Sequence, residues 1–382
     1  MNNISIKASP SFQQLSKKVK LKNREIIQEL TFFEKGREAL LFGLDELKID
    51  KNKKILIPGY ICSSMTNPLL RNGFKIIYYD INKDFSLNID KLKKLIKYER
   101  ISVLIIVHYF GILTEIDEIY SLCRLNNIEI IEDFCHSFLT RFANKQKDFS
   151  KTTKIYSIRK NLPIIDGGAL ENKNFESFVT IKIQSIKFKE ILFLILRFIE
   201  SSINTFGIPN LYGNVIRNLK IKINKSNRIH KINSSKKEVS KIKNPSYMLF
   251  KYLNSSLYLK NISERRRNNF YFLQDEINKI GLNVSFFSIL HNSVPQFLPI
   301  LLNDKNQNLF NELNNNGIET IRWPDYEIPS YIMENKNNFP NSIFLNKNII
   351  LIPVHQDLTK ENCKKIIKVI SSFLKMKRLN NN

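Results

Sequence analysis

The sequence predicts an α/β fold with a large, mostly parallel sheet domain and a smaller α+β domain at the C-terminus. From about residue 33 onwards, helix-like and strand-like patterns alternate along the chain. The strand-like segments are apolar on both faces, which is typical of parallel strands covered by helices on either side. The 382 residues are enough for a large core and a second, smaller unit.

The first half of the chain supplies the parallel sheet. Short apolar runs predict strands, and apolar residues recurring every three to four positions predict helices. The predicted strands are 53–59, 74–81, 101–111, 128–133, 154–158 and 167–171. The helices predicted among them are 37–47, 61–73, 88–97 and 115–127. Strand and helix in this order indicate βαβ units, whose crossovers make neighbouring strands parallel.

The second half predicts a smaller domain with strands of its own. Residues 175–270 have helical patterns interrupted by a basic, Asn-rich stretch. Strands are predicted at 295–302, 317–323 and 348–354, and helices at 306–316 and 359–375. We therefore expect an N-terminal arm (1–30), a large domain (31–245) and a small domain (246–382).

The formal net charge of +25 raises the question of an anionic partner. The basic residues are mostly lysine and accompany Asn and Ile along the whole chain, so we attribute the excess to composition. One basic stretch, residues 218–243, is interpreted as a solvated loop, and binding of an anionic partner there stays the alternative. We expect no nucleic-acid partner, and only weak, salt-sensitive binding to duplex DNA.

No segment indicates secretion, a membrane span, a disulfide framework or a metal site. The N-terminus, MNNISIKASP, lacks the apolar core of a signal peptide, and the longest apolar run covers only residues 191–199. The four cysteines have no CxxC spacing, and no His, Cys, Asp and Glu cluster has ligand spacing. These observations predict a cytoplasmic protein with no bound metal ion.

The residues that follow the predicted strands lie where ligands bind in open parallel sheets, beyond the carboxyl ends. These residues are Pro58 to Tyr60, Asp80, His108 to Gly111, Glu132, Asp133 and Ser157 to Lys160. A lysine amine near the buried acid Asp133 suits an enzyme that binds an aldehyde as a Schiff base, and His136 follows that acid closely. The helix that Arg37 and Glu38 open offers free N–H groups to a phosphate, and Gly36 before it permits close approach.

Each of these residues also has an ordinary structural interpretation. Asp133 alone is most simply an acid that caps a loop, and His136 alone a polar residue packed at a sheet edge. Lys160 alone is one more exposed lysine, and His108 alone a donor to a backbone carbonyl. Their order and placement together favour a cofactor site. Gly-rich phosphate loops of the GxGxxG or GxxxxGK[ST] kind are absent from the sequence.

Several collinear stretches resemble the DegT/StrS family of pyridoxal-phosphate-dependent sugar aminotransferases. They are GREALLFGLDEL, ILIPGYICSSMTNPLLRNGFKIIYYDIN, VLIIVHYFGI, IEIIEDFCHSF, YSIRKNLPIIDGGALE, GIETIRWP and LIPVHQDLT. The resemblance covers about residues 33–172 and 296–378. It implies the type I aminotransferase fold, a homodimer with its active site near the subunit interface, and pyridoxal 5'-phosphate as the cofactor.

The resemblance also implies a role for each site residue. Lys160 would form the Schiff base and act as the catalytic residue, Asp133 would pair with the pyridine nitrogen, and His136 would approach the phenolic oxygen. Ser157 and the turn of Arg37 and Glu38 would hold the phosphate. The predicted cofactor-binding residues are Arg37, Glu38, Cys62, His108, Asp133, His136, Ser157 and Lys160, with Cys62 standing where many members carry an aromatic ring.

Two departures from the family pattern concern the phosphate. Ser157 and Lys160 are three residues apart, with Arg159 between them, as in a divergent branch of the family. The N-x-R element that reaches the neighbouring subunit's phosphate is not found. We expect one or more of three consecutive arginines, Arg265, Arg266 and Arg267, to face anionic groups in its place, and a solvated helix start is the alternative.

The leading hypothesis is an enzyme that transfers an amino group, with glutamate as the expected donor, to a nucleotide-linked keto-sugar for polysaccharide or amino-sugar synthesis. Two alternatives stay open. One is a pyridoxal-phosphate-dependent sugar dehydratase, and the other is a non-catalytic binding protein of the same fold. Tyr60, Cys62 and the helical stretch 263–273 are the expected contributors to the dimer interface.

Overall fold

The computed structural model describes residues 3–10, 29–143, 152–172, 185–188, 190–196, 241–282, 284, 286–287, 289, 292–324 and 328–379. Its main feature is a seven-stranded sheet with the order β1-β7-β6-β5-β4-β2-β3. The strands are β1 (Leu30–Phe33), β2 (Lys54–Pro58), β3 (Lys75–Tyr79), β4 (Ile101–Val107), β5 (Glu129–Asp133), β6 (Thr153–Ser157) and β7 (Gly168–Glu171). Strands β2 to β6 are mutually parallel, and β7 is antiparallel to both β6 and β1. The predicted α/β class with a large, mostly parallel sheet is confirmed.

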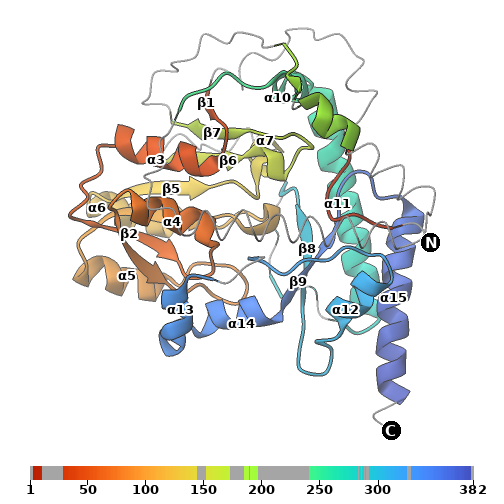
Figure 1. Cartoon of the computed structure of the whole chain (residues 1–382). Helices are drawn as coiled ribbons and strands as arrows, with labels where there is room; N and C mark the ends of the chain where they lie inside the picture. Colours follow the sequence, from red (N-terminus) through yellow and green to blue (C-terminus); the bar gives the residue numbers. More distant parts are fainter. Residues whose placement is uncertain are drawn as a thin grey trace.

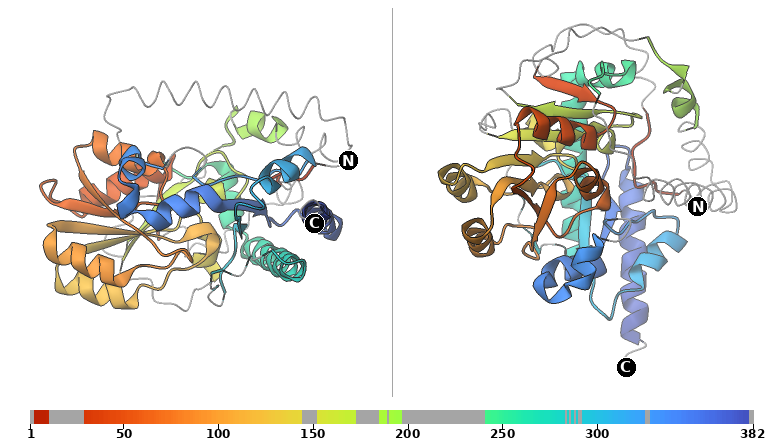
Figure 2. Two further views of the ribbon diagram at one scale, coloured as in Figure 1. Left: turned by 90° about the horizontal axis from the view of Figure 1, so that it is seen from below. Right: turned by 60° about the vertical axis from the view of Figure 1, so that its left-hand side comes forward.

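Helices cover both faces of this sheet. They are α3 (Gly36–Glu46), α4 (Ser63–Arg71), α5 (Ile89–Tyr98), α6 (Asp117–Leu125) and the short α7 (Phe138–Ala143). The left view of Figure 2 shows α3 and α4 on one side of the sheet and α5 and α6 on the other. All seven residues of β4 are buried, as expected for a central strand between two helical layers.

Local sequence explains where several of these helices begin and end. The side chain of Asn88 accepts the backbone N–H of Lys91 and caps the start of α5. Gly73, just beyond α4, has a φ of +81°, a left-handed conformation that favours glycine. Strand β1 lies at the predicted boundary between the arm (1–30) and the large domain, where the sequence predicted no strand, and it pairs only with β7.

A second sheet has two antiparallel strands, β8 (Phe297–Leu301) and β9 (Ile349–Pro353). The third strand predicted here, 317–323, forms only isolated bridges, from Ile321 to Leu351 and from Ile318 to Ile4. The helices around this sheet are α10 (Tyr247–Leu253), α11 (Ser256–Lys279), α12 (Leu309–Asn315), α13 (Ser330–Glu334), α14 (Pro340–Asn348) and α15 (Lys360–Leu379). Figure 1 shows the long helices α11 and α15 side by side.

The part of the predicted arm that the structure describes, residues 3–10, packs against the C-terminal half of the chain. Ile4, Ile6 and Ala8 are buried, and the N–H of Ile4 donates to the carbonyl of Gly317. The basic stretch at 218–243 lies outside the described residues up to position 240.

One hydrophobic cluster contains residues from both sheets, for example Ile105 of β4 and Ile350 of β9. The two parts of the chain therefore share apolar packing. A polar contact adds to it, because the buried carboxylate of Asp80, directly after β3, accepts three hydrogen bonds from the start of α14. Its donors are the N–H of Ser342 (2.8 Å), the hydroxyl of Ser342 (2.6 Å) and the N–H of Asn341 (3.0 Å).

Replacing Asp80 with alanine is expected to lower the free energy of unfolding by about 3 kcal/mol, because buried donors at the start of α14 lose a charged acceptor. Urea unfolding measures the change. Asp304, which is exposed, serves as the control, and its alanine variant should stay within about 0.5 kcal/mol of the wild type. Equal stability of the two variants would contradict a stabilising role for the Asp80 contact.

Candidate functional site

Asp133, His136 and Lys160 lie at the carboxyl edge of the parallel sheet. Asp133 is the last residue of β5, and Lys160 ends a single 3-10 turn (Ile158–Lys160) that follows the neighbouring strand β6. Lys160 Nζ lies 3.1 Å from His136 Nε2. The structure thus brings together the lysine and the histidine that the sequence predicted, with the predicted acid three residues before that histidine.

Asp133 is a buried carboxylate that accepts the N–H of Cys135 at Oδ1 (2.7 Å) and is also hydrogen-bonded to the Cys135 thiol. Within the described residues no Lys, Arg or His forms an ion pair with it. A buried carboxylate is costly unless it is compensated by a cation or further donors. The position therefore favours a ligand that presents a cationic N–H group to Asp133.

His136 is buried between aromatic rings. Its ring stacks on Phe110 at a centroid distance of 5.5 Å and meets Trp323 edge to face at 5.1 Å. Its Nδ1 is buried and has no hydrogen-bond partner among the described residues. Burial, with a contribution from the positive charge of Lys160, holds the pKa of His136 well below its ordinary value of 6.5. The imidazole is therefore neutral at neutral pH.

The lowered pKa of His136 predicts a pH-dependent stability. Below pH 6.5 the unfolded chain binds a proton at this residue and the folded chain does not, so stability falls as the pH falls. The loss can reach about 1.4 kcal/mol per pH unit. We expect the wild type to lose more stability between pH 6.5 and 5.5 than a His136→Gln variant, as measured by urea unfolding. Parallel pH profiles for the two proteins would contradict this assignment.

The start of helix α3 packs against the ends of β5 and β6. A Cβ atom at Gly36 would lie 2.9 Å from the carbonyl oxygen of Tyr156 and 3.1 Å from the sulfur of Cys135, so only glycine allows this approach. Ser157 is buried beside it, and its side chain makes no capping hydrogen bond to the 3-10 turn that follows. The positive end of the helix dipole and a serine hydroxyl thus meet near Lys160, an arrangement suited to a phosphate.

Arg37 and Glu38 open this helix as predicted, but the Glu38 groups are already used. Its N–H donates to the carbonyl of Lys35 (3.0 Å), and its carboxylate accepts the N–H of Glu34 (3.3 Å). Burial raises the pKa of the Glu38 carboxyl above its ordinary value. Glu38 is therefore better described as a cap for the chain before α3 than as a phosphate ligand.

The predicted cofactor contact of His108 is not supported by its surroundings. Its Nε2 lies 2.8 Å from Glu132 Oε2, and its Nδ1 accepts the N–H of Thr114 (3.0 Å). Glu132 and Asp133 are successive residues of β5 and point to opposite faces of the sheet. His108 thus pairs with the acid that faces away from Asp133, and we do not retain it among the proposed cofactor ligands.

Cys62 and Tyr60 differ in how far they can serve a ligand or a partner subunit. Cys62 is half-buried directly before α4, with its sulfur 2.9 Å from the hydroxyl of Ser64. It therefore remains a candidate both for a cofactor contact and for the dimer interface. Tyr60 is fully buried within the chain and donates its hydroxyl to the carbonyl of Trp323 (2.7 Å). The expectation that Tyr60 contributes to a dimer interface is therefore corrected.

The three consecutive arginines of α11 point in different directions. Arg265 is exposed, and Arg266 is buried against protein groups, the carbonyl of Asn161 and the side chain of Gln356. Arg267 is half-buried, and its Nη1 has no hydrogen-bond partner among the described residues. Of the three, Arg267 keeps the prediction of a contact with an anionic group.

Sequence reasoning missed the residues that surround the lysine and the histidine from the second half of the chain. Trp323 packs on His136, and Gln296 donates to the carbonyl of Lys160 (2.9 Å). Trp323 is the single tryptophan and precedes a proline, but neither fact shows which residues it contacts. These contacts join positions more than 130 residues apart, so no local pattern reports them.

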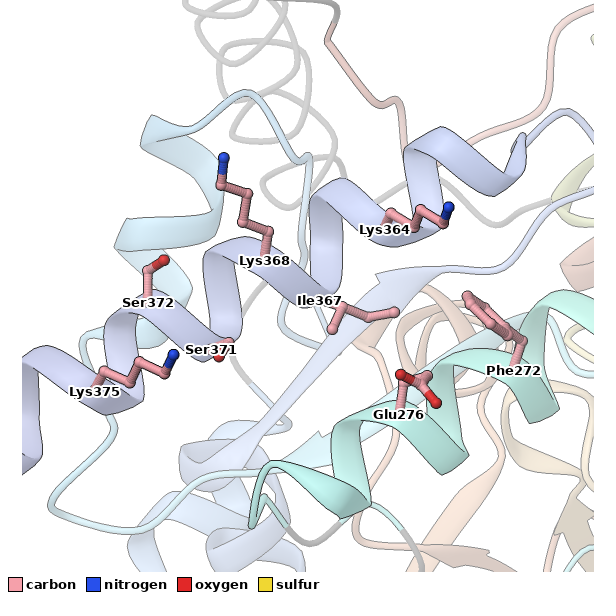
Figure 3. Close-up of a pocket in the computed structure, with 8 residues that line it drawn as sticks. All are labelled: Phe272, Glu276, Lys364, Ile367, Lys368, Ser371, Ser372 and Lys375. Carbon is pink, nitrogen blue, oxygen red and sulfur yellow. The ribbon is translucent and has the colours of Figure 1, made fainter.

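An open groove of about 640 Å³ lies between α11 and α15. Figure 3 shows the residues that line it, which include Phe272 and Glu276 on α11 and Lys364, Lys368 and Lys375 on α15. None of the predicted site residues lines it. Within the same residues there is no group of His, Cys, Asp and Glu suited to a metal ion, and no helix has the length and apolarity needed to cross a membrane.

Comparison with known proteins supports the resemblance seen in the sequence. Residues 30–184 match the model of the DegT/DnrJ/EryC1/StrS aminotransferase family, so the resemblance is confirmed over this stretch, which contains Asp133, His136 and Lys160. The structure aligns with the pyridoxal-phosphate form of the sugar aminotransferase Spr1654 from Streptococcus pneumoniae, described as putative, over 98% of this chain and 99% of that one, with a TM-score of 0.63 and 15% identity. This likeness confirms the type I aminotransferase fold.

Two curated relatives match part of the chain. A transaminase of UDP-4-amino-4,6-dideoxy-N-acetyl-beta-L-altrosamine from Helicobacter pylori is 24% identical over 156 residues, which are 39% of this chain and 41% of that protein. A 3-oxo-glucose-6-phosphate:glutamate aminotransferase from Bacillus subtilis is 26% identical over 144 residues, which are 37% of this chain and 32% of that protein. The matched part thus spans about two fifths or less of the length of these relatives.

Proposed function

We propose that the chain is a pyridoxal-phosphate-dependent aminotransferase that transfers an amino group from glutamate to a nucleotide-linked keto-sugar. The observation that carries this proposal is the grouping of Lys160, His136 and Asp133 at one sheet edge, within the stretch that matches the aminotransferase family. The sugar and the donor are proposed from what the two curated relatives act on.

The residues at the sheet edge fit pyridoxal phosphate. Lys160 would hold its aldehyde, and the buried carboxylate of Asp133, which has no ion-pair partner among the described residues, would accept the N–H of a protonated pyridine ring. The unpartnered Nδ1 of the buried His136 shows that this imidazole still has hydrogen-bonding capacity for a ligand oxygen. Ser157 and the start of α3 with Gly36 would receive the phosphate.

The protein groups would then divide the work of amino transfer. Bound pyridoxal phosphate supplies an electron-withdrawing ring that takes up the electron pair left when a substrate carbon loses its proton. The Lys160 amine would carry that proton between the carbon atoms of the substrate and of the cofactor. Asp133 would keep a proton on the ring nitrogen, and Phe110 and Trp323, packed around His136, would keep water away from the histidine side of the site.

We further propose that the protein is a cytoplasmic homodimer that serves polysaccharide or amino-sugar synthesis. The half-buried Cys62 and Arg267 remain the candidates near a partner subunit or an anionic substrate group. Sedimentation of the purified protein tests the dimer, and a monomer that binds pyridoxal phosphate tightly would contradict it. A sugar dehydratase is disfavoured, because Lys160 is present where such an enzyme loses or alters the base.

Reduction with borohydride, followed by peptide mapping, tests the cofactor assignment. The purified protein, saturated with pyridoxal phosphate, should show a visible absorption band that borohydride abolishes. The pyridoxyl group should then be found on the peptide that contains Lys160. A label on another lysine, or no label at all, would contradict the proposed function and favour a non-catalytic binding protein.

A further inference from the structure

The turn that carries Lys160 is held by two side chains from the second half of the chain. The backbone carbonyl of Lys160 accepts a hydrogen bond from Gln296 Nε2 (2.9 Å), just before β8. The backbone carbonyl of Asn161 accepts one from Arg266 Nη2 (2.9 Å), on α11. Two successive peptide groups beside the candidate catalytic amine are therefore fixed from outside the parallel sheet.

Arg266 is buried and contacts protein groups, so it does not line a surface that is open to a ligand. It is 3% exposed, and its Nε donates to Gln356 Oε1 (3.1 Å), which lies just beyond β9. Burial lowers the pKa of the Arg266 guanidinium to about 10, and Asp357 and Tyr258 partly oppose this shift. The side chain therefore remains charged at neutral pH and forms charge-assisted hydrogen bonds to neutral groups.

The contact continues to the acid and the histidine of the site. The Asn161 side chain donates through Nδ2 to the carbonyl of Cys135 (3.2 Å), which lies between Asp133 and His136 in the chain. Arg266 thus holds Asn161, and Asn161 holds both the lysine turn and the loop that bears the acid. The series Gln356, Arg266, Asn161 and Cys135 joins the end of β9 to the end of β5.

We propose that Arg266 is a positioning residue that sets the placement of the Lys160 amine against His136, with Gln296 as a second hold on the same turn. Its consequence for amino transfer rests on the proposed function, but the placement itself does not. Loss of the guanidinium would leave the carbonyl of Asn161 without this donor, and the turn would move away from the site. The Arg266 guanidinium reaches its two acceptors through two nitrogens of a fixed planar fork, whereas a lysine ammonium has one nitrogen on a flexible stem.

The proposal is tested by the chemical reactivity of Lys160 in the full chain after cofactor removal with hydroxylamine. Brief acetylation with acetic anhydride, followed by peptide mapping, compares Lys160 with the exposed Lys91 in the same sample. In Arg266→Gln the relative labelling of Lys160 should rise by roughly tenfold, the factor expected from loss of a charge-assisted hydrogen bond. Arg266→Lys should give a relative labelling of Lys160 between those of the wild type and Arg266→Gln. Gln296→Glu should also raise this labelling.

Two control variants separate positioning from general stability. Lys260→Gln changes an exposed charge on the same helix and should leave the labelling unchanged. Ile366→Val trims a buried residue of α15 and destabilises the fold without touching the turn. Unchanged labelling of Lys160 in Arg266→Gln would overturn the proposal. An equal rise in Ile366→Val at a similar loss of thermal stability would overturn it as well.

The rate of cofactor attachment, followed by the visible band on mixing with pyridoxal phosphate, gives a second readout. Arg266→Gln should slow it by roughly tenfold relative to Lys260→Gln. If the wild type binds no pyridoxal phosphate while the labelling results are as expected, the proposed function fails and the positioning role stands. Normal attachment in a variant with raised labelling would show that the turn moves without effect on the site, and would overturn the role in positioning.

Discussion

Replacement of Lys160 with arginine is expected to abolish amino transfer while the chain still folds. Arginine keeps the positive charge and much of the length of lysine, but its guanidinium does not lose a proton in proteins. It therefore serves neither as a covalent partner for an aldehyde nor as a proton carrier. Loss of a positioned acid–base group alone typically costs a factor of about 10² to 10⁴, and loss of the covalent step adds to it. The residual rate should therefore fall to the background of free pyridoxal phosphate.

The half-reaction with glutamate provides the measurement, because it needs no knowledge of the sugar. Wild-type protein loaded with pyridoxal phosphate should lose its visible band on addition of glutamate, and the Lys160→Arg variant should show neither that band nor the change. Lys97→Arg, an exposed lysine on α5, should behave as the wild type does. A Lys160→Arg protein that transfers amino groups at more than about a hundredth of the wild-type rate would contradict the assignment.

The strands of the large sheet could be predicted from sequence because each is a short apolar run bounded by turn residues. β4 is the clearest case, since all seven of its residues are buried and apolar or β-branched apart from one serine. β1 was missed because four residues, LTFF, follow a basic stretch and gain their strand character only by pairing with β7. The run 317–323 looks like a strand locally, but its neighbours provide only single bridges.

The site was predicted where topology alone determines position, and missed where orientation matters. Parallel strands bring Asp133 and the Lys160 turn to one edge whatever their side chains do. The sequence does not show toward which face of the sheet His108 points. A strand that is apolar on both faces has no alternation of apolar and polar residues that would indicate the two faces. Tyr60 was expected at the dimer interface and Arg266 near an anionic group because no local pattern shows their real partners. These partners, Trp323 and Asn161, lie far away in the sequence.

Replacement of Asp133 with asparagine is expected to keep the fold and remove most of the catalytic rate. The amide oxygen can still accept the N–H of Cys135, so the local turn is retained. The amide carries no negative charge, however, and its NH₂ group would face the N–H of a protonated pyridine ring, donor against donor. An electrostatic contact of this kind is worth a few kcal/mol, so we expect a loss of roughly two or more decades in rate.

The same substitution, which lowers the catalytic rate, should preserve or raise the stability of the cofactor-free chain. Asp133 is a buried carboxylate that is hydrogen-bonded to the N–H and the thiol of Cys135 but has no ion-pair partner among the described residues, and such a charge costs free energy in the folded state. Without cofactor, Asp133→Asn should therefore be at least as stable as the wild type in urea. With pyridoxal phosphate bound, the wild type should gain more stability than the variant, because its carboxylate then has a cationic partner. Asp90→Asn, an exposed acid on α5, is the control for both measurements. A variant that is less stable without cofactor and nearly normal in the glutamate half-reaction would show that Asp133 only caps its loop, which is the structural alternative that the sequence left open.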